Sequence, residues 1–340
     1  MSRYRLPSRR SLAAILAVAS LPVAALAQDD HPHAGMLRYP DVSATHITFV
    51  YANDLWVVPR EGGVARPVAS PSGPEQNPRF SADGQTLAFV GNFDGDRDLY
   101  TIALDGDTPH RVTHHPANET FSDWTADGRL VFSSWLYPGS HAHGPGLYSV
   151  DAGGGMPDRL PVPYGGNGAV SADGVWLAYT PSIRENRTWK RYQGGLAQDV
   201  WLFNLETNAS QRVTDYAGTD TSPMWHGEKL YYLSDNTESG RLNLFVHDPA
   251  TGEKTQVTDY TDNDVKFPSI GPGTEGQGEV IFQLGTELML LDLGSGETTA
   301  VDITVPGVRN ALRPQIVDAA ELIMDGGVSA TGQRAVVEAR

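Results

Sequence analysis

Short runs of aliphatic, β-branched and aromatic residues alternate with turn residues along almost the whole chain. The runs are too short for helices, and after the first 27 residues no long stretch repeats its apolar positions with the helical period of about 3.6. Short apolar runs bounded by Gly, Asp, Asn and Pro are typical of strands joined by tight turns. The pattern therefore predicts an all-β protein.

One sequence unit of about 40–50 residues recurs along the chain. It opens with Ser/Thr-Ala-Asp-Gly and continues with a short apolar strand, a loop, an aromatic-containing strand, a turn, and a strand with Arg-Val-Thr. Three near-identical openings stand at residues 81–84, 125–128 and 171–174. Asp-Gly suits a tight hairpin because glycine accepts the positive φ that such turns require. The unit is therefore expected to form a four-stranded antiparallel sheet.

Each landmark of the unit occurs six times. The second strands are expected to start at Ile47, Leu87, Leu130, Leu177, Leu230 and Val280. The third strands are expected at 54–56, 98–100, 146–148, 199–201, 243–245 and 287–289. The fourth strands are expected to begin near Ala65, Arg111, Arg159, Arg212, Gln256 and Ala300. Because one such sheet cannot bury both of its faces, repeats of this length stack into a ring. The sequence predicts a six-bladed β-propeller.

The propeller is expected to span residues 37–305, followed by a linker at 306–326 and the truncated start of a second propeller at 327–340. In that last segment, Val328–Arg334 resembles the opening turn of the unit and Ala335–Glu338 its second strand, so a truncated gene or a fragment is expected. The first strand of the first blade and the fourth strand of the sixth blade are expected at the two ends of the propeller sequence. We therefore expect that no blade is shared between the ends and that side-chain packing closes the ring.

The first residues form a predicted signal peptide, residues 1–27. Arginines precede an apolar run that ends in Ala25-Leu26-Ala27, the small-x-small pattern that signal peptidase cuts. The run is too short for a comfortable membrane span, so no stable membrane anchor is expected. Ser8–Leu12 also resembles a twin-arginine signal, and both export routes remain open. The mature protein is expected to be periplasmic or secreted, with a short linker at 28–36.

The net charge limits the classes of expected partner, and the cysteine content limits how the fold can be stabilised. Removal of residues 1–27 would take away four arginines and no acidic residue, so the formal net charge would change from −16 to −20. A surface this acidic repels phosphate backbones, which excludes nucleic acid as an expected partner. The chain contains no cysteine, so packing alone must stabilise the fold.

The unit resembles TolB-like propeller repeats, and the chain as a whole resembles the N-terminal propeller of tricorn-type serine peptidases. The resemblance to the first unit of that family lies in Leu37–Pro40 and in Asp54-Leu55-Trp56 with the turn that follows. The most diagnostic stretch is Trp189–Gly195 followed by Gln198–Trp201. Pro223–Trp225 and Phe267–Ser269 support it more weakly.

This resemblance implies a six-bladed propeller followed by a seven-bladed one and then by PDZ and serine-peptidase domains. Propellers of such enzymes are thought to gate and channel peptides. The catalytic positions of the family would lie beyond Arg340, so none can be assigned to this chain. The expected partners are peptides or the missing protease domains, and a homo-oligomer of the full-length protein is also compatible with this interpretation.

Candidate catalytic and metal-binding motifs are weak. There is no Gly-x-Ser-x-Gly motif, and Ser295 lies in a predicted hairpin turn. The acidic loop Asp94–Asp98 resembles a calcium loop but has Leu99 where such loops need glycine. The pairs His31/His33 and His141/His143 lack the four ligands of a structural zinc site. We expect no catalytic residue, no metal and no cofactor.

The segment from Arg184 to Tyr192 is the exception. It concentrates positive charge and aromatic rings in an insertion of the fourth blade of an acidic chain, through Arg184, Arg187, Trp189, Lys190, Arg191 and Tyr192. Arginine binds carboxylates through paired hydrogen bonds, so a peptide C-terminus is one candidate ligand. Docking onto the missing domains and a solvated loop are the alternatives.

Three interpretations follow from the sequence. The first is a non-catalytic gating or scaffold propeller of an exported tricorn-like peptidase. The second is a free-standing TolB-like propeller in the periplasm that binds another protein. The third is a propeller enzyme with a site in its central channel, for which the sequence shows no convergent polar or metal-ligand set.

Overall fold

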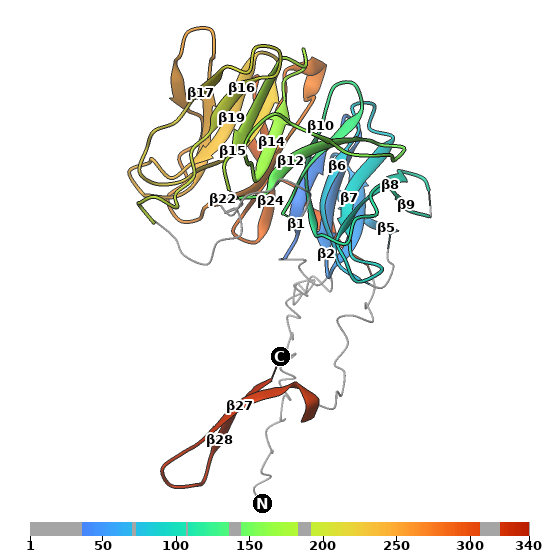
Figure 1. Ribbon diagram of the computed structural model, residues 1–340, viewed down its shortest axis with the longest axis vertical. Coiled ribbons are helices and arrows are strands. Elements are labelled where there is room, and N and C mark those ends of the chain that lie inside the picture. Colours follow the sequence, from blue (N-terminus) through green and yellow to red (C-terminus); the bar gives the residue numbers. More distant parts are fainter. Residues whose placement is uncertain are drawn as a thin grey trace, which may run out of the picture.

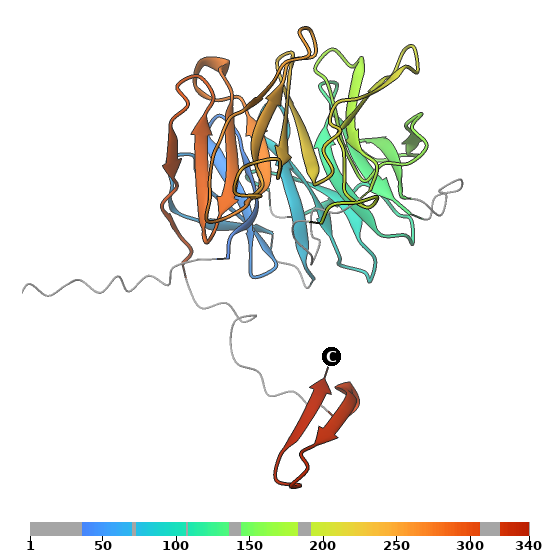
Figure 2. The same ribbon diagram turned by 90° about the vertical axis from the view of Figure 1, so that its left-hand side faces the viewer.

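The computed structural model describes residues 36–69, 73–106, 108–135, 144–182, 192–306 and 320–339. Six four-stranded antiparallel sheets surround an axis, which confirms the predicted six-bladed propeller (Figures 1 and 2). Blades 1 to 3 consist of β1 (Arg38–Val42), β2 (His46–Tyr51), β3 (Asp54–Pro59) and β5 (Arg66–Ala69); β6 (Glu75–Phe80), β7 (Thr86–Gly91), β8 (Asp98–Ala103) and β9 (His110–Arg111); and β10 (Glu119–Trp124), β11 (Arg129–Ser134), β12 (Gly146–Asp151) and β13 (Asp158–Arg159).

Blades 4 to 6 have the same strand order. They consist of β14 (Asn167–Val170), β15 (Trp176–Thr180), β16 (Trp201–Asn204) and β17 (Ser210–Arg212); β18 (Asp220–His226), β19 (Lys229–Ser234), β20 (Asn243–His247) and β21 (Lys254–Gln256); and β22 (Val265–Gly271), β23 (Glu279–Leu284), β24 (Glu287–Asp292) and β25 (Thr298–Ala300). A short 3₁₀ helix, η1 (Thr274–Gly276), joins β22 to β23.

The predicted second strands are confirmed, since each begins one residue before its expected start. The fourth strands start one or two residues before the predicted residues in five blades and end at them. The cause is that polar residues directly after the turn already pair with the third strand, as His110 pairs with Thr101. Only in blade 1 does the predicted residue, Ala65, precede its strand.

The second strands form the centre of the core. In β7, Leu87, Ala88, Phe89 and Val90 are all buried, although successive side chains point to opposite faces of the sheet. Both faces are covered because each blade is packed between two neighbours. This explains why these strands are continuous apolar runs in the sequence, whereas a strand with one solvated face would alternate.

The Ser/Thr-Ala-Asp-Gly signature forms the turn between the first and second strands. The Ser81 hydroxyl donates to Asp83 Oδ1 over 2.6 Å, and the Gly84 amide donates to the Ser81 carbonyl over 2.8 Å. Gly84 has φ +69°, the conformation that makes glycine favourable here. Equivalent bonds occur in the turns at 125–129 and 171–175.

Closure of the ring differs from the expectation. No blade is shared between the two ends of the ring, as predicted, but side-chain packing is not the only link. After blade 6, β26 (Ile303–Thr304) pairs in parallel with β4 (Gly63–Val64), which lies in the turn between β3 and β5 of blade 1. The Gly63 amide donates to the Asp302 carbonyl over 2.8 Å, and the Ala65 amide donates to the Thr304 carbonyl over 2.9 Å. We call this pairing the latch.

The latch depends on a close backbone approach. Gly62 has φ +90°, and a Cβ atom there would lie 2.4 Å from the Asp302 carbonyl oxygen. Beside the latch, the Arg60 guanidinium forms an ion pair with the fully buried carboxylate of Glu279 across the seam between blades 1 and 6. The expectation of a ring closed by side chains alone is therefore corrected, because backbone hydrogen bonds also join its ends.

Near the C-terminus, η3 (Ala320–Leu322) precedes a hairpin of β27 (Ile323–Val328) and β28 (Ala335–Ala339). Its turn repeats the bonds of the blade turns, with the Ser329 amide donating to the Arg334 carbonyl over 2.8 Å. This strand pair is consistent with the start of a further repeat, and the expected boundary after residue 326 lies within β27. Among the described residues, none of the helices has the length and apolar character required to span a membrane.

Candidate functional site

Most of the sequence-predicted site lies outside the described residues. This holds for Arg184, Arg187, Trp189, Lys190 and Arg191, for the cleavage residues Ala25 and Ala27, and for both histidine pairs. Tyr192 is described and half-buried, and it lies between β15 and β16 as expected. The roles suggested for these residues stay predictions.

The acidic loop before β8 interacts with an arginine. Arg111 donates to Asp94 over 3.1 Å and to the fully buried Asp98 over 2.6 Å. Burial raises the pKa of Asp98, and the Arg111 guanidinium partly offsets that rise. In the described part of the chain, no three His, Asp or Glu side chains gather in a way that could bind a metal ion.

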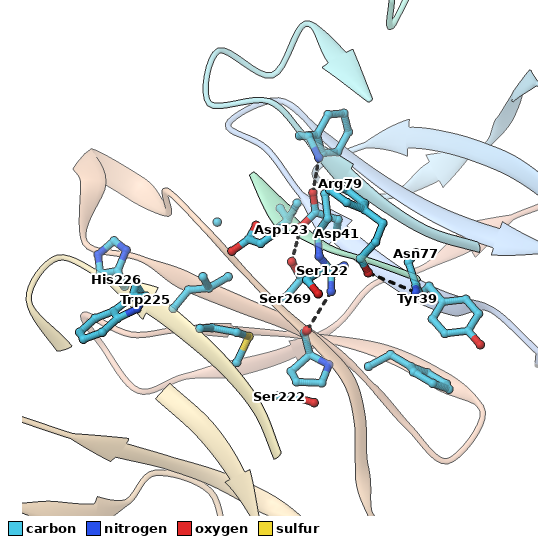
Figure 3. A pocket seen from close by; sticks show the side chains of 18 of the residues that line it. Tyr39, Asp41, Asn77, Arg79, Ser122, Asp123, Ser222, Trp225, His226 and Ser269 are labelled. Carbon is cyan, nitrogen blue, oxygen red and sulfur yellow. Dashed lines mark hydrogen bonds between the residues drawn. The ribbon is translucent and has the colours of Figure 1, made fainter. Parts of the chain in front are cut away.

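The main cavity of the protein lies on the propeller axis and has a volume of about 570 Å³. The first strands of all six blades contribute to its wall, so it is a product of ring closure and of no single blade. Residues from the blade 2 turn, among them Ser81 and Asp83, line its rim. The side chains that line the wall are shown in Figure 3.

Four of the six inner strands contain the same irregularity, a residue with positive φ directly before a proline. These residues are Tyr39 (φ 51°), Asn77 (φ 50°), Ser222 (φ 53°) and Phe267 (φ 49°). At each of them the pairing with the second strand shifts, which is the mark of a β-bulge. Proline is tolerated there because it has no amide proton to leave unpaired in the ladder. The X-Pro pairs at equivalent places in the repeat are the sequence signal that could have located these bulges.

The bulges provide acceptors for a cation on the cavity wall. The Arg79 guanidinium donates to the carbonyl oxygens of Pro40 (3.2 Å), Pro78 (3.3 Å) and Pro268 (3.4 Å). These are the bulge prolines of blades 1, 2 and 6, so one side chain connects three blades at the axis. Sequence reasoning missed this site because backbone acceptors leave no side-chain signature.

Two carboxylates accompany Arg79. Asp41 accepts from the Phe80 amide over 2.6 Å and from the Ser269 hydroxyl. Burial raises the pKa of Asp41, an effect that Arg79 and these hydrogen bonds counteract. Burial also raises the pKa of Asp123 to about 6, with the positive charge of Arg79 opposing it. Asp123 accepts from the Trp124 amide over 2.9 Å.

The arrangement favours binding over chemistry. Ser269 is a hydroxyl on the cavity wall, but it donates its proton to the Asp41 carboxylate, and this bond does not involve the imidazole base that activates serine in hydrolases. Aromatic rings stand beside the polar groups, with Tyr39 and Phe267 ring centroids 4.5 Å apart. A cavity with apolar faces and a few polar groups is typical of a ligand-binding site.

Comparison with known proteins agrees with this fold. Tricorn protease homolog 1 of Streptomyces coelicolor is 28% identical over 306 residues, which cover 89% of this chain and 28% of that protein. The tricorn protease of Thermoplasma acidophilum is 27% identical over 238 residues, covering 66% of this chain and 22% of that protein. The chain thus spans about a quarter of the length of the relatives that it matches.

Solved structures show the same fold. The crystal structure of the tricorn protease superposes with a TM-score of 0.68 at 22% identity, over 81% of this chain and 27% of that one. TolB from Acinetobacter baumannii has a TM-score of 0.53 at 19% identity, over 69% of this chain and 57% of that one. A family model, described as the tricorn protease N-terminal β-propeller domain, matches residues 34–297. Since this match covers well over half of the sequence, the chain belongs to the family of tricorn protease N-terminal β-propeller domains.

Proposed function

We propose that this chain is the non-catalytic propeller part of an exported, tricorn-like serine peptidase. In this role the axial cavity admits and channels peptides, while the blades scaffold protease domains. The observation that carries the proposal is the cavity of about 570 Å³, to which all six inner strands contribute. Its size suits an extended segment of a peptide, since ligand pockets of about 300–1,000 Å³ bury most of a small ligand.

Photo-crosslinking tests the proposal. A short peptide with a benzoylphenylalanine residue is irradiated with the full chain, and the labelled residues are identified by mass spectrometry. We expect labels on inner-strand residues of several blades, such as Asn77, Asn167 and Ser222, which line the cavity. Labels confined to the outer strands would contradict a peptide role for the cavity.

The absence of catalysis is tested with the same preparation. We expect the purified chain to leave casein and small peptides intact, because this part of a tricorn-like peptidase would supply passage and not the nucleophile. Cleavage that copurifies with the chain and is lost in Ser269→Ala would favour an enzyme with its site in the channel.

The cationic insertion between β15 and β16 is proposed to dock the protease domains. Arg184, Arg187, Lys190 and Arg191 offer positive charge in an acidic chain, which suits an acidic domain surface. Neutralising all four should weaken assembly with the protease part of the protein. Unchanged assembly and unchanged peptide binding would remove any functional role for the segment.

A second candidate is a free-standing propeller that binds another protein, favoured by the structural likeness to TolB. The two candidates differ in the gene sequence beyond the codon for Arg340. An open frame that continues into more propeller repeats and a peptidase domain supports the first candidate. A stop codon without a peptidase downstream supports the second.

A further inference from the structure

The charged groups deep in the axial cavity do not balance. Two carboxylates, Asp41 and Asp123, face one guanidinium, Arg79, and each carboxylate is affected electrostatically by that arginine. Asp41 is buried and Asp123 is half-buried in the cavity wall, and the ionised form of a desolvated carboxylate is costly without a cation beside it. Lys266 and Asp83 also line the cavity but are exposed to solvent, so the deep part of the cavity has one more carboxylate than it has cations.

The two carboxylates differ in their hydrogen bonding. Asp41 is fully engaged, because one oxygen accepts from the Phe80 amide and the other from the Ser269 hydroxyl. Arg79 is engaged as well, through the three bulge carbonyls. Asp123 differs, because its Oδ1 accepts from the Trp124 amide while the carboxylate points into the cavity (Figure 3).

A second unsatisfied group lies next to Asp123. Ser122 lines the same cavity, and its Oγ is shielded from solvent without a hydrogen-bond partner. A shielded hydroxyl without a partner is unusual in native proteins. Rotation about the Cα–Cβ bond of Ser122 would be needed to turn this hydroxyl toward a ligand in the cavity. Ser122 and Asp123 come from the bulge of β10, where the register shifts between Phe121 and Asp123.

We propose that Asp123 and Ser122 bind a primary ammonium group of a peptide that enters the cavity. An ammonium is a compact charge with three donors, so it can bind one carboxylate oxygen and one hydroxyl together. A guanidinium presents its donors in a rigid planar fork that matches a carboxylate alone, whereas a compact ammonium can also bind the neighbouring hydroxyl. The inference rests on the proposed entry of peptides, and it names the chemical group that the cavity selects.

The structure contains an internal precedent for cation binding on this wall. Arg79 shows that the bulge carbonyls accept a positively charged donor, and it does so on the side of blades 1, 2 and 6. Asp123 belongs to blade 3, where β10 faces the glycine-containing wall of blade 4 at Gly166 and Gly168.

The test uses the full chain and C-terminally fluorescein-labelled hexapeptides of alanine and glycine. One peptide has a free N-terminus, a second is N-acetylated, and a third is N-acetylated with lysine at its second position. Fluorescence anisotropy gives the affinities. We expect the free peptide to bind at least about tenfold more tightly than the acetylated one, as a charged hydrogen bond is worth about 1.5–3 kcal/mol.

Three variants distinguish binding at this site from background binding. Asp123→Asn keeps the acceptor for the Trp124 amide but should abolish the preference for the free peptide. Asp127→Asn makes the same charge change at an exposed turn residue outside the axial cavity and should retain the preference. Ser122→Ala should weaken binding of the free peptide severalfold without affecting the acetylated one.

The outcomes separate this inference from the proposed function. If both peptides bind the unaltered chain equally, or if Asp123→Asn keeps the preference, the ammonium site is refuted while peptide entry stands. If neither peptide binds, both proposals are wrong. Tight binding of the lysine peptide shows that the site accepts any primary ammonium, whereas weak binding limits it to the peptide N-terminus.

Discussion

The ring has two kinds of seam between blades. Between blades 6 and 1, the chain provides no direct connection. An apolar cluster that includes Trp56 and Leu288 fills this interface, and the latch and the ion pair of Arg60 with Glu279 are added to it. Between blades 3 and 4, the chain itself connects the blades, and an apolar cluster that includes Leu147, Leu177 and Phe203 fills the interface. Apolar packing is thus common to both seams, whereas the strand pairing and the ion pair accompany the seam that lacks covalent continuity.

Loss of apolar packing at the connected seam should have the largest effect. Leu147→Ala is expected to lower the free energy of unfolding by about 3 kcal/mol, because Leu147 is fully buried and leaves a cavity. Leu288 occupies the same position of the unit at the latched seam, and Leu288→Ala should cost a similar amount. Urea denaturation measures both variants.

The conservative variant Leu147→Met provides the control, with an expected loss below about 1.5 kcal/mol because side-chain volume is retained. If Leu147→Ala cost less than half of Leu288→Ala, packing would not be what holds blades 3 and 4 together. The comparison between the seams would then have to be revised.

The latch is tested with two glycines that occupy the same place in two equivalent turns. Gly62 has φ +90° and Gly154 φ +95°, and each donates its amide to the carbonyl three residues before it. A Cβ at Gly62 would lie 2.4 Å from the Asp302 carbonyl oxygen, whereas a Cβ at Gly154 would lie 3.4 Å from its nearest neighbour, the Val112 carbonyl oxygen. Only the first turn forms a latch.

Gly62→Ala should therefore lower the free energy of unfolding by about 2 kcal/mol and Gly154→Ala by about 1 kcal/mol. In both variants alanine is strained by the positive φ, but only Gly62→Ala also loses the latch. Hydrogen exchange gives the second readout. The Ala65 amide, which donates to Thr304, should exchange faster in Gly62→Ala and at an unchanged rate in Gly154→Ala. Equal costs and equal exchange would show that the latch contributes nothing.

The sequence predicts the connected parts of the ring better than the latched seam, for a physical reason. The turn at Ser81–Gly84 and the apolar strand after it are local features, so a few consecutive residues specify them. The latch instead joins β4 and β26, which lie far apart in the sequence and pair through backbone atoms alone. No side-chain pattern marks such a pair.

The candidate site shows the same limit. Each X-Pro bulge can be located in the sequence, but the convergence of Pro40, Pro78 and Pro268 on Arg79 depends on the curvature of the ring. Asp123 and Ser122 look like ordinary strand residues until closure brings six inner strands around one cavity. The binding role predicted for the cationic insertion was inferred from its composition alone. Composition can indicate a binding surface, but it does not show what that surface contacts.

Among the described residues, the seam between blades 1 and 2 shows no link of the kind that two other seams have. Thr113 accepts from the Leu99 amide over 2.9 Å and donates to Glu119 at the start of the next blade. Thr214 forms the same connection to Asp220. At the seam between blades 1 and 2, Ala69 stands six residues before Glu75, where those two seams have threonine.

Glu75 consequently offers the most subtle test of the comparison. Its side chain is buried, and no described side chain donates to it. Burial together with the negative charge of Asp54 raises its pKa to about 9, an effect that the backbone amide of Leu55 partly opposes. At pH 7.5 the folded protein therefore keeps a proton that the unfolded chain, with the ordinary value of 4.5, has released. Stability is expected to fall as pH rises through this window.

Glu75→Gln removes that dependence and should raise the free energy of unfolding by about 2 kcal/mol at pH 7.5, with little effect at pH 4.5. Glu119→Gln is the matched control, because Thr113 already satisfies Glu119. It should lower stability by about 1 kcal/mol through the loss of a charged hydrogen bond. Urea denaturation of both variants at the two pH values gives the comparison. If Glu75→Gln raised the free energy of unfolding equally at both pH values, Glu75 would destabilise the protein through its packing and not through its ionisation. The missing threonine would then not explain the destabilisation.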